Sequence, residues 1–263
     1  MFLSNYKLFE TDEIQQVQFQ HRLDLMEAFG VKKGMRVLEI GCGQGDTTAA
    51  LADAVGIDGK VFAIDIASRD YGAPLTLGQA TDRIKRSRLG ERITFHFETD
   101  FASFESNEIF DVAVLSHSSW YFKRPEDLLH YVKKLRSMTT CICFAEWDLD
   151  YTYLSQRVHF CAASILALHS KFVGNDGNIQ NLFHEEQILE LLEEAGFQNV
   201  KQDIVDATYL PDAQWEKSYT NSIRKDFANV PTMIQTLVTS YYELMNASNE
   251  KEQSLNSFII CAT

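Results

Sequence analysis

The stretch Val37-Leu38-Glu39-Ile40-Gly41-Cys42-Gly43-Gln44-Gly45-Asp46 is the most informative part of the chain. Its first residues form an apolar run typical of a buried strand, and small apolar residues at 47–55 predict a helix directly after it. The three alternating glycines between them can turn sharply and let a ligand approach the backbone closely. The stretch therefore predicts an α/β fold with a ligand-binding loop after its first strand.

The spacing of the glycines limits the kind of ligand. A dinucleotide-binding loop has the pattern G-x-G-x-x-G, and its third glycine would stand where this chain has Asp46. A carboxylate at the start of the helix would repel a pyrophosphate, and no Gly-Lys-Ser/Thr follows that would make a P-loop. The loop is therefore predicted to hold a nucleotide-like ligand that carries no phosphate.

Strand and helix patterns alternate around this loop. β-branched or aromatic runs typical of strands lie at 36–40, 60–66, 93–97, 110–115 and 141–146. Helical patterns lie between them at 47–55, 74–89 and 125–136. This alternation predicts parallel β-α-β units and a doubly wound α/β sheet.

The second half of the chain is richer in helical patterns. Apolar residues at helical spacing predict a long helix over 154–172 and another over about 185–195. Further strands are predicted at 200–205 and 257–262. Between these strands lies a mostly helical stretch with one apolar face, formed by Met233, Leu237, Tyr241 and Leu244.

Two acidic residues follow predicted strands at the edge where ligands bind in open α/β sheets. Asp65 comes after the second strand, and its carboxylate can accept hydrogen bonds from both hydroxyls of a ribose. Asp100 comes after the third strand and can accept from an adenine amino group. Ile66 and Phe101, each one residue further on, can sandwich a flat base. Aspartates are also common turn residues, but their joint placement favours a nucleoside site.

At this point the chain resembles a known family. The run Glu-x-Gly-x-Gly-x-Gly at 39–45, with Asp65 and the pair Asp100-Phe101, is similar to the class I S-adenosylmethionine-dependent methyltransferases of the small-molecule type. The resemblance covers about residues 30–205 and the last predicted strand. It implies a seven-stranded, mostly parallel sheet of order 3-2-1-4-5-7-6 whose last strand is antiparallel. The implied cofactor is S-adenosylmethionine, with S-adenosylhomocysteine as product.

The resemblance also assigns roles to individual residues. The glycine loop would pass under the methionyl part of the cofactor, Glu39 would help to hold its amino end, and Asp65 would bind the ribose. The residues predicted to bind the cofactor are Glu39, Gly41, Cys42, Gly43, Gly45, Asp65, Ile66, Asp100, Phe101 and Ser116.

The chain is interpreted as one methyltransferase domain over 1–263. Its predicted parts are an N-terminal lid helix within 1–30, a cofactor-binding core at 31–147, and helical cap insertions at 148–183 and 207–254. The insertions stand where small-molecule methyltransferases carry the segments that cover the acceptor.

The segment Ser116-His117-Ser118-Ser119-Trp120-Tyr121-Phe122 follows the fourth strand and borders the transferred methyl group in related enzymes. It lacks the Asn/Asp-Pro-Pro-aromatic pattern of enzymes that methylate planar amino groups, and it lacks a Pro-Cys nucleophile. His117 is the candidate catalytic base, because an imidazole titrates near neutral pH. The alternative is a hydrogen-bonded histidine that positions this loop.

Aromatic and acidic residues near this segment predict the acceptor site. The substrate-binding candidates are Tyr6, Trp120, Tyr121, Glu146, Trp147 and Tyr151. Aromatic walls suit a partly apolar organic acceptor or a cationic amine, while packing in the core is the alternative for such residues.

No metal site is predicted. Glu146, Asp148 and Asp150 could suggest a divalent cation, but the Asp-Asn pair of catechol-type O-methyltransferases is not evident. Three histidines have no ligand-like spacing and are interpreted as ordinary helix or loop residues: His159, His169 and His184.

The composition of the chain limits the kinds of binding partner and cellular compartment that can be expected. The 263 residues carry 24 Lys+Arg against 37 Asp+Glu, a net charge of −13, which disfavours binding to a nucleic-acid backbone. The five cysteines include no C-x-x-C pair and fit a reducing compartment. With no signal peptide or apolar run long enough for a membrane span, a soluble cytoplasmic protein is expected, without nucleic-acid or membrane partner.

The sequence therefore predicts a methyltransferase that uses S-adenosylmethionine and transfers its methyl group to O or N of a small organic acceptor by in-line displacement. The first alternative is an NAD(P)-binding oxidoreductase, which would need the glycine missing at Asp46. The second is a non-catalytic module that binds S-adenosylmethionine. Methylation of protein or RNA is disfavoured by the capped site and the negative charge.

Overall fold

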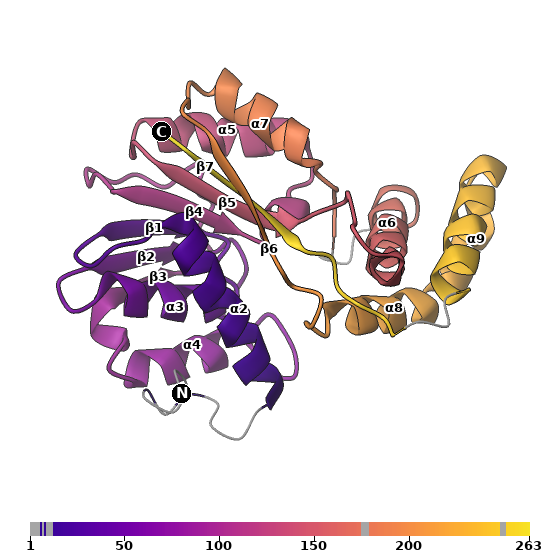
Figure 1. Ribbon diagram of the computed structural model, residues 1–263, viewed down its shortest axis with the longest axis horizontal. Helices are drawn as coiled ribbons and strands as arrows, with labels where there is room; N and C mark the ends of the chain where they lie inside the picture. The colour runs from indigo at the N-terminus through magenta and orange to yellow at the C-terminus, as the bar shows by residue number, and fades with distance from the viewer. Residues whose placement is uncertain (1–5, 7, 9–12, 175–178, 248–250) are drawn as a thin grey trace.

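A computed structural model describes residues 6, 8, 13–174, 179–247 and 251–263 of the chain. At its centre lies a seven-stranded sheet of order β3-β2-β1-β4-β5-β7-β6 (Figure 1). Its strands are β1 (Arg36–Ile40), β2 (Lys60–Ile64), β3 (Ile93–His96), β4 (Val112–Ser116), β5 (Ile142–Trp147), β6 (Lys201–Val205) and β7 (Ser257–Ala262). The first five strands pair in parallel, and β7 runs antiparallel to both β5 and β6. The predicted fold class and strand order are confirmed.

The apolar composition of the central strands follows from their cover on both faces. Every residue of β4 and β5 is buried, whereas four of the five residues of the edge strand β6 are exposed. Side chains alternate between two cores, so that Val114 packs on one face and Leu115 on the other.

Helices cover both faces of the sheet (Figure 1). One core includes residues of α2 (Glu13–Phe29), α3 (Asp46–Val55) and α4 (Leu77–Arg86). The other includes residues of α5 (Pro125–Arg136) and α7 (Glu185–Glu194). Both α3 and α5 start within one residue of their predicted positions, and Pro125 stands in the first turn of α5.

The helix predicted over 74–89 is shorter than expected. It begins only at Leu77, because Thr76 is its N-cap and exchanges hydrogen bonds with Gln79 in a capping box. It ends at Arg86, where the next residue leaves the helical conformation.

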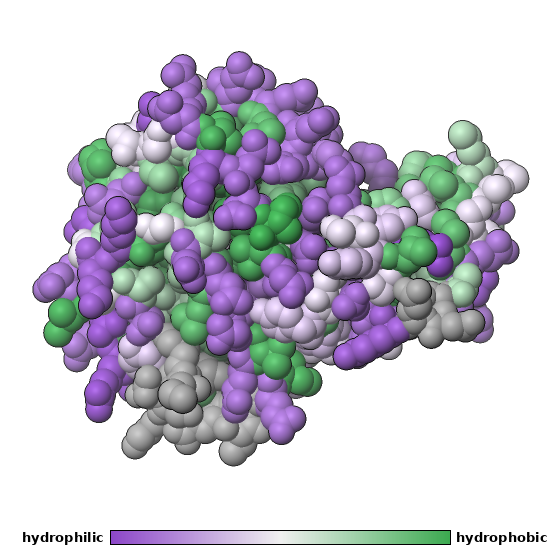
Figure 2. Space-filling view, in the orientation of Figure 1, coloured by the Kyte–Doolittle hydropathy of each residue, from purple (hydrophilic) through white to green (hydrophobic). Residues whose placement is uncertain are grey.

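Helices from the two predicted insertions pack into one body, which we call the helical subdomain (148–174 and 207–247). Here α6 (Arg157–Phe172) contacts both α8 (Asp212–Ser222) and α9 (Thr232–Asn246). The subdomain extends beyond one end of the sheet (Figure 1), and space-filling representation shows it as a narrow projection (Figure 2). Segments about fifty residues apart in sequence therefore fold together.

Helix α9 presents three of the four residues of the predicted apolar face to solvent, whereas Tyr241 is half-buried and packs against Phe160. Met233 is 80% exposed, and Leu237 and Leu244 are also exposed. The buried residues of α9 are Val238, Tyr242 and Met245, which lie on the neighbouring helical stripe. Contact with α6 therefore selects a face that apolar periodicity did not identify.

Parts of the predicted lid and insertions lie outside the described residues. Of the predicted N-terminal lid, residues 1–5, 7 and 9–12 lie outside the described part of the chain, as do 175–178 and 248–250 of the insertions. Within what is described, no helix combines the length and apolar character that crossing a bilayer requires.

Candidate active site

The glycine loop joins the carboxyl end of β1 to the first turn of α3. Gly41 has a φ of +80° and Gly45 one of +89°, a region that favours glycine. A Cβ atom on Gly41 would come within 2.5 Å of the Ser118 Cβ, so the loop lies directly against the segment that follows β4. At this edge the chain therefore presents backbone rather than side chains.

Asp65 is folded onto this loop. It follows β2, and its Oδ2 accepts a hydrogen bond from the Gly43 amide at 2.7 Å. Its Oδ1 accepts from the Ala67 amide at 2.8 Å. The two bonds fix the carboxylate beside the loop and leave further lone pairs on both oxygens for a ligand. The fold thus brings together the two sequence features, glycine loop and acid, on which the nucleoside prediction rests.

Glu39 and Cys42 lie beneath the loop surface. Glu39 is 1% exposed, and its Oε2 accepts a hydrogen bond from Thr48 Oγ1 at 2.6 Å. Burial raises the pKa of the Glu39 carboxyl to about 8, and burial also raises the pKa of the Cys42 thiol. Glu39 therefore connects β1 to α3, and its contact with a ligand stays a prediction.

The predicted adenine side is only partly open. Asp100 accepts a hydrogen bond from the Tyr131 hydroxyl of α5. The Phe101 ring is 1% exposed, because Tyr131 packs edge-on against it and Lys134 Nζ lies 5.1 Å from its centre. Ile66 is 67% exposed. Of the two residues predicted to hold the base, Ile66 offers a free face and the Phe101 ring does not.

Arg22 on α2 belongs to this edge, and the sequence analysis missed it. Its Nη2 lies 3.5 Å from Gln18 Oε1, while its Nε and Nη1 are buried without a hydrogen-bond partner among the residues described. Burial raises the pKa of Glu39 and of Asp46, and the positive charge of Arg22 acts in the opposite direction on both. The available signal was an arginine on a helix predicted to cover the same edge.

His117 follows β4 with a φ of +49°, a conformation uncommon for a residue with a side chain. Its Nε2 lies 3.1 Å from Ser257 Oγ, which lies 3.1 Å from His21 Nε2. Its Nδ1 lies 3.4 Å from Glu146 Oε1. Burial holds the pKa of His117 well below its ordinary value. Because both ring nitrogens face protein groups, the geometry favours the alternative of a positioning histidine.

Glu146 anchors the turn that follows His117. It is 1% exposed, and its Oε2 accepts hydrogen bonds from the Ser119 amide at 3.1 Å and the Ser119 hydroxyl at 2.7 Å. Its Oε1 accepts from the Trp147 amide at 3.1 Å. Burial raises the pKa of this carboxyl to about 7. Glu146 therefore fixes η2 (Ser119–Tyr121) against the end of β5.

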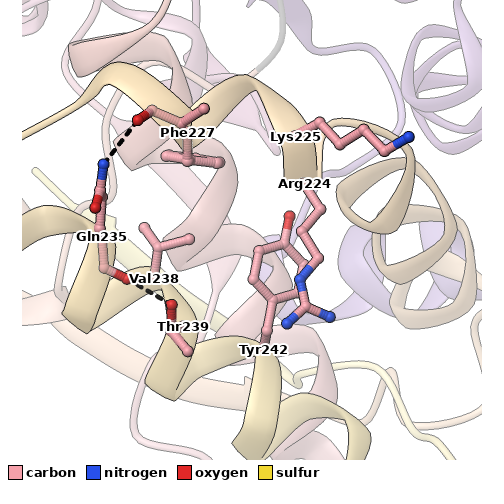
Figure 3. A pocket seen from close by; sticks show the side chains of 8 residues that line it. Arg224, Lys225, Phe227, Gln235, Val238, Thr239 and Tyr242 are labelled. Atoms are coloured by element: carbon pink, nitrogen blue, oxygen red, sulfur yellow. Dashed lines mark hydrogen bonds between the residues drawn. The ribbon is translucent and has the colours of Figure 1, made fainter.

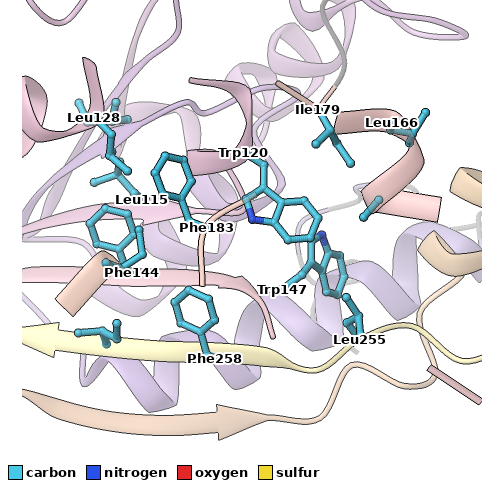
Figure 4. Packing of buried hydrophobic residues seen from close by; sticks show 14 of the residues in the cluster. Leu115, Trp120, Leu128, Phe144, Trp147, Leu166, Ile179, Phe183, Leu255 and Phe258 are labelled. Atoms are coloured by element: carbon cyan, nitrogen blue, oxygen red, sulfur yellow. The ribbon is translucent and has the colours of Figure 1, made fainter. Parts of the chain in front are cut away.

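Aromatic residues continue the site toward the helical subdomain. The Trp147 ring lies between the rings of His117 and His159, with centroids 4.3 and 4.8 Å away. Trp120 is buried and points toward Trp147 (Figure 4). Tyr121 is 55% exposed. The partial loss of water around its hydroxyl group, followed by the negative charges of nearby carboxylates, raises its pKa.

The remaining two substrate-binding candidates, Tyr6 and Tyr151, make contacts in different parts of the chain. The Tyr6 hydroxyl donates to Asp53, which stands near the end of α3, away from the glycine loop. Tyr151 packs against Phe160 within the helical subdomain, with ring centroids 5.6 Å apart. Tyr6 is thus not brought to this edge, because α3 carries its partner to the opposite end of the sheet.

Polar atoms that lack partners gather at this edge. Among the residues described, the buried atoms without a hydrogen-bond partner include Arg22 Nε and Nη1, Ser116 Oγ and Trp120 Nε1. Leaving such atoms unpaired is costly, so their concentration indicates a place built for polar ligands. The bare backbone, the Asp65 carboxylate and the Arg22 guanidinium fit an adenosine that carries an amino acid tail. Among the residues that the structure describes, no three His, Cys, Asp or Glu side chains gather as metal ligands.

A separate cavity of about 410 Å³ lies within the helical subdomain (Figure 3). It is lined by Arg224, Phe227, Val238 and Tyr242, and the Arg224 guanidinium lies 4.7 Å from the centre of the Tyr242 ring. None of the residues predicted for the site lines this cavity.

Comparison with known sequences gives a consistent family. A family model described as a methyltransferase domain matches residues 12–202. The chain is 26% identical over 189 residues to a demethylmenaquinone methyltransferase of Geobacillus kaustophilus, covering 68% of this chain and 78% of that protein. It is 30% identical over 115 residues to methyltransferase phomM' of Diaporthe leptostromiformis, covering 36% of this chain. That match spans only 30% of the fungal protein.

Solved structures share the fold. A crystal structure of a cyclopropane-fatty-acyl-phospholipid synthase-like protein from Lactobacillus casei superposes with a TM-score of 0.86 and 36% identity, covering 95% of this chain and 92% of that one. Phosphoethanolamine N-methyltransferase 2 of Haemonchus contortus, in complex with S-adenosyl-L-methionine, superposes with a TM-score of 0.53 and 17% identity. This second match covers 93% of this chain and 52% of that one.

Proposed function

Since the chain belongs to the S-adenosylmethionine-dependent methyltransferase family, we propose that it transfers the methyl group of this cofactor to a nitrogen or oxygen atom of a small organic acceptor. The observation that supports the cofactor site best is the Asp65 carboxylate, fixed against the glycine loop by the Gly43 amide. A carboxylate in this position can accept both hydroxyls of a ribose.

The proposed cofactor site uses the loop and its acidic neighbours. Asp65 would bind the ribose, Asp100 the adenine amino group, and Ile66 one face of the base. The Arg22 guanidinium would bind the carboxylate of the methionyl tail, because its Nε and Nη1 are buried donors without a partner in the described chain. When bound, S-adenosylmethionine supplies an electrophilic methyl group on a positively charged sulfur.

The chain's own contribution to the reaction is alignment and exclusion of water. In-line displacement at a methyl group needs an acceptor held in line, and a site closed to water supports this. Glu146 would fix the η2 turn beside the methyl group, and His117 would hold Glu146 through its Nδ1. We therefore propose that His117 acts as a positioning residue, with Trp120, Tyr121 and Trp147 around the acceptor.

Helix α2 and the helical subdomain would together cover the acceptor. Gln18 of α2 donates to Asp212 of α8 at 3.0 Å, so the N-terminal helix is connected directly to the second insertion. This contact supports the lid proposed for 1–30 and the caps proposed for 148–183 and 207–254.

The alternatives have less support. An NAD(P) oxidoreductase would place a pyrophosphate at Asp46, whose carboxylate begins α3. A non-catalytic module that binds only the cofactor would not need Trp120 Nε1, a buried donor among the acceptor aromatics that has no partner in the described chain. The name of the Lactobacillus casei protein suggests a carbon acceptor in an acyl chain, and an acceptor screen can test this directly.

The cofactor site is tested by calorimetric titration with S-adenosylhomocysteine. Asp65→Ala should weaken binding by about 1–3 kcal/mol, because it leaves the ribose hydroxyls without their acceptor. Asp58→Ala is the matched control, since Asp58 is exposed in the turn before β2, at the opposite end of that strand. Equal affinities of wild type and Asp65→Ala would remove the ribose assignment, and no binding by wild type at millimolar ligand would end the proposal.

The acceptor is tested by a methyl-release screen over amines, phenols, carboxylates and unsaturated phospholipids. Turnover on at least one small amine or hydroxyl compound is expected. Turnover confined to the phospholipids would replace the proposed acceptor class.

A further inference from the structure

A histidine–carboxylate pair joins the two insertions beside the acceptor aromatics. His159 of α6 is fully buried, and its Nε2 lies 3.1 Å from Oε2 of Glu216 on α8. The Glu216 side chain is 21% exposed. The pair therefore connects a buried imidazole to a carboxylate that still has free surface.

The hydrogen bonding of His159 fixes its neutral tautomer. Its Nδ1 accepts a hydrogen bond from the Leu255 amide at 2.9 Å, so Nδ1 carries no proton. The proton of the neutral ring then lies on Nε2, the atom that faces Glu216. This arrangement orients the carboxylate, as second partners of catalytic groups commonly do.

The pair lies on the acceptor side of the site. Gly41 abuts Ser118 in the segment after β4, His117 in that segment contacts Trp147, and Trp147 contacts His159. These contacts lead from the glycine loop to β5, in the direction opposite to β2 and Asp65. Glu216 is also the carboxylate with the largest effect on Tyr121.

The pair has unused hydrogen-bonding capacity. Beyond the contact with His159 Nε2, the Glu216 side chain has no hydrogen-bond partner within the described chain, so its carboxylate keeps lone pairs for a ligand. Trp120 Nε1 is likewise buried without a partner there. A carboxylate with free lone pairs and a buried indole donor without a partner indicate a polar ligand beside the aromatics.

The charges around the pair are negative. Burial lowers the pKa of His159, but the carboxylates of Glu216, Asp212 and Glu146 together raise it by more. The groups that act on Tyr121 are likewise acidic, since Glu216, Glu146, Tyr71 and Asp212 all raise its pKa. Acidic groups beside exposed aromatic surface favour a cation over a neutral or anionic compound.

We propose that Glu216, oriented by His159, binds the ammonium group of a cationic amine acceptor and takes the proton that this group must lose before it is methylated. The proposal rests on the proposed function and names its substrate class. The ammonium transfers one proton to a Glu216 oxygen, which leaves a neutral amine with a free electron pair. That pair forms the new N–C bond, and the electron pair of the breaking C–S bond remains on sulfur.

Binding is measured without turnover, in the presence of S-adenosylhomocysteine. The probes are 2-phenylethylamine, 2-phenylethanol and phenylacetate, which differ mainly in charge, and tryptophan fluorescence reports binding near Trp120 and Trp147. Wild type should bind the amine at least about tenfold more tightly than the alcohol, a difference of about 1.4 kcal/mol, and the carboxylate most weakly. Equal or weaker binding of the amine, or no binding of it at 50 mM (about the practical limit for a weak ligand), would overturn the proposal.

Glu216→Gln tests the carboxylate itself. It should abolish the preference for amine over alcohol and lower kcat for any amine that wild type methylates. Asp226→Asn is the matched control, because Asp226 lies 3.3 Å from His169 in a second histidine–carboxylate pair that joins the same insertions. A preference retained in Glu216→Gln, or lost equally in both variants, would contradict the proposal.

The positioning role of His159 needs a separate readout. His159→Gln keeps a donor toward Glu216 and should retain the amine preference, whereas His159→Ala should lose it. Unfolding measurements identify a variant that merely fails to fold. The affinity for S-adenosylhomocysteine distinguishes a failure of the proposed function from a failure of this inference. Intact cofactor binding with no amine preference overturns this inference alone, whereas absent cofactor binding in wild type overturns the proposed function.

Discussion

At the scale of single residues, burial changes the chemistry of the acids at the carboxyl edge. Glu39 and Glu146 are each 1% exposed, yet each is a hydrogen-bond acceptor for groups from another element. Their spacing in sequence suggested contacts with ligands, whereas their positions make them connectors between β1, α3, β5 and η2. The charged side chains that we propose for ligand contacts are Asp65, Asp100, Arg22 and Glu216.

Glu39 should make stability depend on pH. A glutamate in the unfolded chain has a pKa near 4.3, and burial raises the folded-state pKa of Glu39 to about 8. Between these values the folded state holds a proton that the unfolded state has released, so the free energy of unfolding falls as pH rises, by up to about 1.4 kcal/mol per pH unit. Above the folded-state pKa no further loss is expected from this group.

Glu39→Gln removes this titration. Urea unfolding at several values between about pH 5 and about pH 8.5, a range that lies mostly between the unfolded-state and folded-state pKa values, should show the variant gaining stability relative to wild type as pH rises. Glu27→Gln, at an exposed position of α2, should follow the wild-type curve. Parallel curves for wild type and Glu39→Gln would show that Glu39 does not titrate in this range.

At the scale of elements, local sequence sets where helices begin, and packing sets which face they bury. Thr76 and Gln79 start α4 through a capping box, three residues after the predicted start at Pro74. Helix α9 has apolar residues on adjacent stripes, and periodicity alone cannot choose between them. Contact with α6 buries Val238, Tyr242 and Met245.

Lysine substitutions should distinguish the two stripes of α9. Val238→Lys places a charge at a position that is 3% exposed and should destabilise the protein by about 3 kcal/mol. Met233→Lys, at 80% exposure, should change stability by no more than about 0.5 kcal/mol. Thermal unfolding of both variants checks this, and a larger loss for Met233→Lys would mean that the buried face of α9 is assigned wrongly.

At the scale of the whole molecule, three separate segments meet at one end of the sheet. Helix α2 contacts α8 through Gln18 and Asp212, and α8 and α6 join through Glu216 and His159. The glycine loop follows β1 of the seven-stranded sheet, α2 packs with α3 on one face of that sheet, and the helical subdomain lies beyond one end of it (Figure 1). Such a division suits a family in which one cofactor site serves many acceptors.

Hydrogen exchange should test the lid role of α2. Binding of S-adenosylhomocysteine should slow amide exchange in the glycine loop and in α2, because Arg22 would then gain a partner. Helix α7 serves as the internal control, since it packs against the other core. Slower exchange in the loop with no change in α2 would show that α2 does not close on the cofactor.

Much of the site could be predicted from sequence, because its parts are local. The end of the strand, the glycine loop and the start of the helix lie within residues 37–46, and Asp65 directly follows a strand, so each feature is encoded without reference to distant residues. Arg22 and Glu216 could not be found in this way. Each is an ordinary charged residue on a helix, and only its neighbours distinguish it.

The order of apolar strands and helices along the chain alone determined the α/β class, because alternating β-α-β units have few ways to pack. The glycine loop and Asp65 were also evident from sequence and led to the family. Tertiary structure decided which acids are buried connectors, that both nitrogens of His117 face protein groups, that Tyr6 lies away from the site, and that His159 meets Glu216. These outcomes depend on contacts between segments far apart in sequence, and burial and unpaired hydrogen-bonding groups arise only when those segments pack together.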